Sequence, residues 1–90
     1  MNEKISEKWL EQDNTLIREF EFETFKQMSH FTLKLFNLYE ELNHHPDTLL
    51  YGYKFLRITT TTHDTGNILT ELDFKLAHRI DIEFEEFISD

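Results

Sequence analysis

The feature that most constrains the fold is a helical pattern of apolar residues that begins after Thr24 and stops before the only proline, Pro46. Thr24 is a suitable N-cap residue. Proline disfavours the helical conformation at the preceding residue, so we expect the helix to run to about Asn43 and end near His44 or His45. The predicted helix has an apolar and a polar arc. The apolar arc holds Met28, Phe31, Leu35, Leu38, Tyr39 and Leu42, and the polar arc holds Lys26, Gln27, His30, Lys34, Asn37 and Glu41.

Three further apolar residues, Phe25, Leu33 and Phe36, widen the apolar side of this helix beyond what one sheet face would cover. Two interpretations stay open. The residues either belong to an aromatic-rich core or pack against another subunit, because exposed apolar surface commonly marks an interface.

Two segments have the composition of strands. From Thr15 to Phe22 the apolar residues Leu16, Phe20 and Phe22 share one parity with Arg18, which predicts a strand with one buried face. The turn residues 12–14 place this strand in a hairpin from about Lys8 to Phe22. The chain is β-rich again from Thr48 to Thr62, with Gly52 as a bend or bulge, and Leu56 and Ile58 are expected to face the helices.

A second helix is predicted from Thr70 to about Ile88. Thr70 followed by Asp73 resembles a capping box, with Asp where Glu or Gln is usual. Asp73 projects from within the apolar arc, so it is either a partner of the helix dipole or part of a site. The predicted core face comprises Leu72, Leu76, Ala77, Ile80, Phe84, Phe87 and Ile88.

This order of elements predicts an α+β fold in which two long helices pack on one face of an antiparallel four-stranded sheet. Ninety residues suit a single domain, residues 1–90. The net charge of −9 comes without a cluster of Lys and Arg, which argues against direct nucleic-acid binding. No apolar run approaches the ~20 residues of a membrane span, there is no cysteine, and no signal-peptide pattern opens the chain. We expect a soluble, cytoplasmic protein.

The polar residues that suggest chemistry lie at the end of the first helix and after the second β-rich segment. Glu40 and His44 are four residues apart and should share a helix face. His45 follows, and Thr62-His63-Asp64 lies downstream. Histidine side chains at a helix C-terminus suit proton transfer near neutral pH. Taken alone, the His-His-Pro run could be a helix stop, and a carboxylate with three histidines could bind zinc or iron.

The ordered set resembles the pterin-4a-carbinolamine dehydratase family, which combines an acidic residue, His-His-Pro, an aromatic, a Thr-His-acidic element and a helix-starting Asp. The matching residues are Glu40, His44-His45-Pro46, Tyr53, Thr62-His63-Asp64 and Asp73, preceded by Trp9 and Phe20-Glu21-Phe22-Glu23-Thr24-Phe25. The resemblance extends from about Trp9 to Phe87. The chain departs from the family at Thr48, where an aromatic is usual, at Thr65-Gly66-Asn67, and in its shortened N-terminal helix. The segment from His45 to His63 is also one residue longer.

The resemblance implies that the protein dehydrates 4a-hydroxytetrahydropterin to quinonoid dihydropterin, using histidines as general acid and base and no metal or organic cofactor. Glu40 and the helix end make His44 the candidate acid, and His63 is the candidate base, although these two roles could be exchanged. His45 would position the substrate or stabilise charge, and Asp73 would orient a histidine or hold the site closed. The resemblance thus implies four catalytic residues, Glu40, His44, His45 and His63. The implied substrate-binding residues are Asn43, His44, His45, Thr61, Thr62, His63, Asp64 and Asp73.

The resemblance also implies a homodimer or homotetramer, built through the long helix and the sheet edge, and a link to aromatic amino-acid hydroxylases. The alternative function is a non-catalytic interaction or dimerisation module, because some family members are partners of transcription factors.

Overall fold

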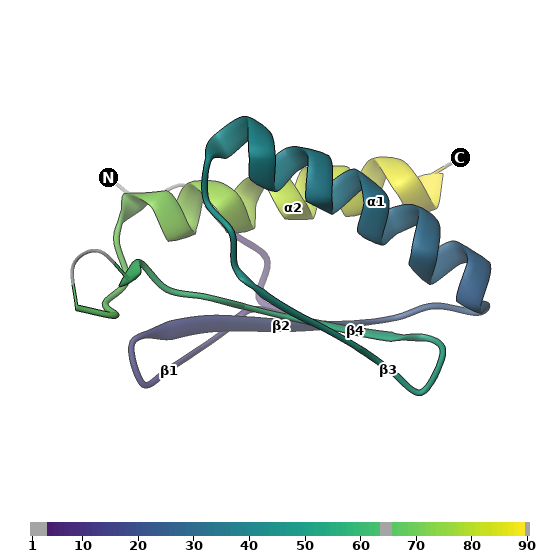
Figure 1. The fold of residues 1–90 in the computed structure, drawn as a ribbon, viewed down its shortest axis with the longest axis horizontal. Coiled ribbons are helices and arrows are strands. Elements are labelled where there is room, and N and C mark those ends of the chain that lie inside the picture. Colours follow the sequence, from purple (N-terminus) through teal and green to yellow (C-terminus); the bar gives the residue numbers. More distant parts are fainter. Residues whose placement is uncertain (1–3, 64–65, 90) are drawn as a thin grey trace.

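The computed structural model describes residues 4–63 and 66–89. Its elements are β1 (Leu10–Gln12), β2 (Thr15–Glu21), α1 (Phe25–Leu42), β3 (Asp47–Tyr51), β4 (Phe55–Thr60) and α2 (Glu71–Ser89). The strands pair antiparallel in one sheet of order β1-β2-β4-β3. Both helices lie on the same face of this sheet (Figure 1). The predicted α+β fold is confirmed.

Two tight turns set the strand boundaries. Asp13 and Asn14 join β1 to β2 with φ angles of 51° and 62°, which confirms the predicted hairpin and suits residues that tolerate positive φ. Gly52 and Tyr53 have φ angles of 58° and 57° in the connection between β3 and β4. Gly52 therefore reverses the chain, and the predicted β-rich segment 48–62 is two paired strands.

The predicted core faces of the sheet and of α1 are confirmed. The buried residues on β2, β4 and α1 pack with those of α2 into one cluster, and Thr24 caps α1 by accepting a hydrogen bond from Gln27 N at 3.1 Å. Phe20, Phe22, Phe31, Phe84 and Phe87 form an aromatic group with ring centroids 4.8–6.5 Å apart, in the range of favourable aromatic pairs.

The predicted core face of α2 is wrong at both ends. Leu76, Ala77 and Ile80 are buried, and Phe84 and Phe87 are partly buried against the core. Leu72 and Ile88, however, are 50% and 55% exposed. They lie in the first and last turns of α2, where the helix periodicity persists but the sheet and α1 no longer cover the side chains.

The segment before β1 is tied to α2 by Asp81. The Asp81 carboxylate accepts hydrogen bonds from Ser6 N, Trp9 Nε1 and Arg18 NH1 at 2.7, 2.7 and 2.6 Å. Trp9 is buried. Between Lys4 and Trp9 the chain forms a turn, not a helix, and Met1–Glu3 lie outside the described residues.

Candidate functional site

The end of α1 directs the two adjacent histidines to different partners. Asn43 adopts the left-handed conformation with φ 51° and ψ 44°, which Asn tolerates better than most residues. The amides Asn43 N and His44 N donate to the carbonyls of Glu40 and Tyr39, the pattern of a Schellman motif. The helix therefore ends at Leu42, and His44 has already left its surface.

This geometry contradicts the expected Glu40–His44 pair. Glu40 Oε2 lies 2.6 Å from Nε2 of His45 instead, in an exposed contact. The helical i,i+4 relation fails because the left-handed residue Asn43 lies between Glu40 and His44. The argument that made His44 the acid through Glu40 is therefore wrong.

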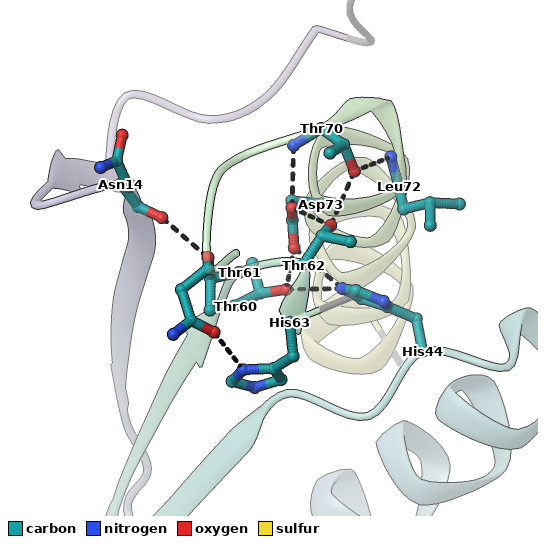
Figure 2. Close-up of polar contacts among 10 residues, drawn as sticks. Asn14, His44, Thr60, Thr61, Thr62, His63, Thr70, Leu72 and Asp73 are labelled. Atoms are coloured by element: carbon teal, nitrogen blue, oxygen red, sulfur yellow. Dashed lines mark hydrogen bonds and ion pairs between the residues drawn. The ribbon is translucent and has the colours of Figure 1, made fainter. Parts of the chain in front are cut away.

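His44 is instead paired with Asp73 at the start of α2. Its Nε2 atom lies 2.8 Å from Asp73 Oδ1 and 3.0 Å from Thr60 Oγ1. The His44 side chain is 13% exposed and that of Asp73 is fully buried. Figure 2 shows the His44 ring meeting residues from the end of β4 and the start of α2.

Asp73 accepts hydrogen bonds on both carboxylate oxygens. Oδ1 accepts from Thr60 Oγ1 at 2.6 Å, and Oδ2 accepts from Thr62 Oγ1 at 2.7 Å and Thr70 N at 3.0 Å. The bond from Thr70 N is one half of the predicted capping box. Burial on its own would raise the pKa of Asp73, but the hydrogen bonds from Thr60, Thr62, Thr70 N and His44 lower it below its ordinary value. Asp73 is therefore a helix cap and a histidine partner at once.

His63 lies three residues beyond the end of β4 with an exposed side chain. Its Nδ1 atom lies 2.6 Å from Asn67 Oδ1. Because a carbonyl oxygen can only accept, Nδ1 carries a proton in this arrangement and Nε2 is left with the lone pair when the ring is neutral. Asp64, which the sequence also placed in the site, lies outside the described residues.

One surface cavity of about 250 Å³ gathers most of the predicted site. It is lined by Asn43, His44, His45, Thr61, Thr62, His63 and Leu72. Asp73 lies buried behind His44, and Glu40 is connected to the cavity through His45. Tyr53 is not among the lining residues, because the β3–β4 turn that carries it lies at the opposite end of the sheet from His44 (Figure 1).

Sequence reasoning missed part of the site. Leu72, a predicted core residue, forms an apolar wall of the cavity. Thr60 had no assigned role, yet it contacts both His44 and Asp73. A signal was present in the sequence, because Thr60 shares the parity of Leu56 and Ile58, and a hydroxyl on that buried face needs a polar partner.

Thr48, the departure from the family pattern, is absent from the cavity lining. It lies 3.0 Å from the hydroxyl of Tyr39 through Oγ1. Burial raises the pKa of Tyr39 to about 12, and the contact with Thr48 opposes that rise. Thr48 thus provides a hydrogen-bond partner for a buried tyrosine.

A second cavity, of about 410 Å³, lies between residues 4–6 and α2. It contains none of the predicted site residues, and its central charges, Arg18 and Asp81, neutralise one another at 2.6 Å. Although this second cavity is larger, the histidine cavity is the candidate functional site, because side chains able to transfer protons converge there.

Within residues 4–63 and 66–89, no three His, Cys, Asp or Glu side chains are grouped so that they could hold a metal ion. No helix in the same ranges combines the length and apolar character needed to cross a membrane.

A family profile and individual related sequences point to the same family. The profile of the family described as "Pterin 4 alpha carbinolamine dehydratase" matches residues 1–82. A Sulfurisphaera tokodaii protein provisionally named pterin-4-alpha-carbinolamine dehydratase is 38% identical over 73 residues, covering 81% of this chain and 76% of that protein. A protein of Saccharolobus islandicus with the same provisional name is 42% identical over 72 residues, covering 80% and 71%.

Two solved structures share the fold. A transcriptional coactivator/pterin dehydratase from Brucella melitensis superposes with a TM-score of 0.79 and 29% identity, covering 86% of this chain and 82% of that one. A pterin dehydratase-like protein, identified as a RuBisCO assembly factor in the alpha-carboxysome, gives a TM-score of 0.66 and 25% identity, covering 83% and 84%. The resemblance noted in the sequence is confirmed by both kinds of comparison: the chain belongs to the pterin-4a-carbinolamine dehydratase family.

Proposed function

We propose that the protein dehydrates 4a-hydroxytetrahydropterin to quinonoid dihydropterin, and so supports the recycling of tetrahydrobiopterin. The observation that carries the proposal is the convergence of His44, His45 and His63 on one cavity, with His44 held from behind by a buried carboxylate. A molecule bound in this cavity would meet imidazoles from the end of α1 and from the segment after β4, as a reaction with one acid and one base requires.

The reaction breaks a bond between a ring carbon and a hydroxyl oxygen. The acid donates a proton to this oxygen, which leaves as water. The base takes the proton of the adjacent ring nitrogen, and the electron pair of that N–H bond forms the new carbon–nitrogen double bond. Both groups then regain their starting states by proton exchange with solvent. The chemistry that we propose draws on no metal or organic cofactor.

In this proposal His44 is the acid and His63 the base. The role of His63 is supported by its contact with Asn67, which leaves Nε2 as the basic atom. His45, joined to Glu40 at the exposed rim, would bind the substrate and stabilise developing charge. Asn43, Thr61 and Thr62 would meet the polar edge of the pterin, together with Asp64.

The test follows the ultraviolet decay of the 4a-hydroxypterin, generated by a phenylalanine hydroxylase, with and without this protein. The wild type should accelerate the decay, and His44→Ala and His63→Ala should each lose ~10²–10⁴-fold in rate. His30→Ala is the matched control, because His30 is exposed on α1 and absent from the cavity lining. Failure of the folded wild type to accelerate the decay contradicts the proposal, and loss of activity on adding a chelator points to a metal site.

A second proposal concerns self-association. Leu33 and Phe36 are 61% and 46% exposed on α1, and surface of this kind commonly belongs to an interface. We propose a homodimer or homotetramer that uses α1 and the sheet edge. Sedimentation at micromolar concentration should show a species above 11.0 kDa, and Leu33→Glu should reduce its mass. A wild type that sediments only as the monomer refutes this assembly.

The same surface supports the alternative function, a non-catalytic interaction module. The two structural neighbours are described as a transcriptional coactivator/pterin dehydratase and as a RuBisCO assembly factor. This function becomes the better explanation if the folded protein leaves the decay of the 4a-hydroxypterin unchanged.

We also propose a cytoplasmic location. Fractionation of the source cells tests it, and recovery of the protein in another fraction would refute it.

A further inference from the structure

The hydrogen bonds around Asp73 determine which nitrogen of His44 holds a proton. An ionised carboxylate only accepts hydrogen bonds, and a threonine hydroxyl has one hydrogen to donate. Thr60 donates that hydrogen to Asp73 Oδ1. Both neighbours of His44 Nε2, namely Asp73 Oδ1 and Thr60 Oγ1, are therefore acceptors toward it. Nε2 must carry the hydrogen that occupies this contact.

The carboxylate cannot turn to relieve this requirement, because its other oxygen is held independently. Thr70 N is a backbone donor that cannot accept, and it contacts Oδ2 together with Thr62 Oγ1. Since the hydrogen of Thr62 goes to Asp73, the hydroxyl of Thr70 donates to Thr62 across their 2.7 Å contact. The three threonines thus hold the Asp73 carboxylate with Oδ1 facing His44 (Figure 2).

The second ring nitrogen of His44 is in a different position. No hydrogen bond to Nδ1 is present within the described part of the chain. Among those same residues, the only buried side-chain nitrogen or oxygen without a partner is Arg18 Nε. Nδ1 is therefore not enclosed in the core, and His44 is one of the residues that line the cavity.

We infer that His44 exchanges its proton with the substrate through Nδ1, while the proton on Nε2 stays on the ring throughout, hydrogen-bonded to Asp73. The contacts from Thr60, Thr62 and Thr70 orient Asp73 for this hydrogen bond. This inference rests on the proposed dehydratase function. The imidazolium form gives its Nδ1 proton to the leaving hydroxyl oxygen, and the carbon–oxygen bond breaks with release of water. The neutral ring that remains is the Nε2–H tautomer, which solvent reprotonates at Nδ1. Asp73 is a positioning residue that acts through His44.

The experiment reads the tautomer directly from ¹⁵N chemical shifts of the His44 ring at alkaline pH, where imidazole is neutral. The wild type should show a protonated Nε2 and an unprotonated Nδ1. A neutral wild-type ring protonated at Nδ1 overturns the inference. This spectrum decides the question even if a variant fails to fold, and it requires no enzymatic turnover.

Asp73→Asn is the informative variant, because the hydrogen bonds around residue 73 determine how the new amide is oriented. Thr70 N requires an acceptor, so the amide oxygen takes the Oδ2 position and the NH₂ group takes the Oδ1 position. That group donates toward His44 Nε2 and forces the proton to Nδ1. The variant should therefore switch tautomer and lose ~10²–10⁴-fold in dehydration rate. A folded variant that keeps the Nε2–H tautomer contradicts the reasoning.

Thr60→Val is the matched control. It disturbs the same carboxylate oxygen but leaves Asp73 as an acceptor, so His44 should remain the Nε2–H tautomer, and a switch here would refute the proposed basis of the effect. Failure of the two proposals can be distinguished. An inactive wild type with the expected tautomer refutes only the dehydratase function. An active wild type with the opposite tautomer refutes only this inference.

Discussion

Replacement of Asp81 by alanine should strongly destabilise the protein without touching the histidine cavity. Asp81 is the only carboxylate within hydrogen-bonding distance of Arg18 in the described residues, at 2.6 Å. The Arg18 side chain is 6% exposed, and its guanidinium lies 4.3 Å from the Phe20 ring centroid and 5.2 Å from that of Phe84. Truncation of Asp81 leaves this cation buried without its counter-ion.

The expected loss follows from the burial of the pair. Removal of one partner of a buried ion pair typically costs ~3–5 kcal/mol. The Asp81 side chain is 15% exposed, so solvent partly compensates Arg18 and we expect a loss near the lower end, about 3 kcal/mol. Natural domains have a total stability of only ~5–15 kcal/mol, so the variant should stay folded with a clearly reduced midpoint.

A double-mutant cycle with Arg18→Met gives the sharper result. Methionine keeps an apolar side chain against Phe20 and Phe84, and without Arg18 there is no buried cation to leave unpaired. Arg18→Met combined with Asp81→Ala should therefore lose less free energy than the sum of the single variants, by about 1–3 kcal/mol. Urea unfolding followed by the fluorescence of Trp9, the single tryptophan, measures each free energy of unfolding.

Glu86→Ala is the control on the same helix, because Glu86 is exposed and its removal should change stability by less than about 0.5 kcal/mol. An Asp81→Ala loss below about 1 kcal/mol, or strict additivity in the cycle, would refute the view that Arg18 depends on Asp81.

Two further predictions concern pH. The pKa of folded Asp73 is lowered, so its contribution to stability is present above the unfolded value of ~3.9 and is lost as the pH falls through the folded value. Acid unfolding curves should therefore show a smaller loss of stability below about pH 4 for Asp73→Asn than for the wild type, and parallel curves would contradict this. The pKa of Tyr39 is raised to about 12, so stability should fall as the pH rises from ~10 toward that value. Tyr39→Phe should reduce this fall and remove the tyrosinate absorbance that appears near pH 12, and an unchanged alkaline profile would count against it.

The helices and strands could be predicted largely from local chemistry. Thr24 and Pro46 bound the first helix, and the alternation around Leu16 and Phe20 marks the buried face of β2. The errors lie where the apolar periodicity of a helix continues but the rest of the protein no longer covers the side chain. Leu72 continues the apolar periodicity of α2, yet its side chain in the first turn is half exposed, so the residue lies at the cavity instead.

The candidate site could be predicted as a set of residues but not as a set of pairs. The His-His-Pro run, Thr62-His63 and Asp73 were recognisable because their types and order are unusual together. The i,i+4 rule linked Glu40 to His44, but the left-handed conformation of Asn43 ended the helix at Leu42, two residues before His44, so the rule does not apply. The conformation of Asn43 thus leaves Glu40 paired with His45, and His44 is paired with Asp73.

By itself the sequence determined the elements, the family and the list of candidate proton-transfer groups, since these depend on neighbouring residues and on residue type. Only the tertiary structure decided that Asp73 faces His44, 29 residues away in the chain, and that Thr60 completes the contact. Such pairs form when β4 and α2 pack at the end of α1. The packing free energy that brings them together is shared among all the buried residues of the core, and no local motif encodes it.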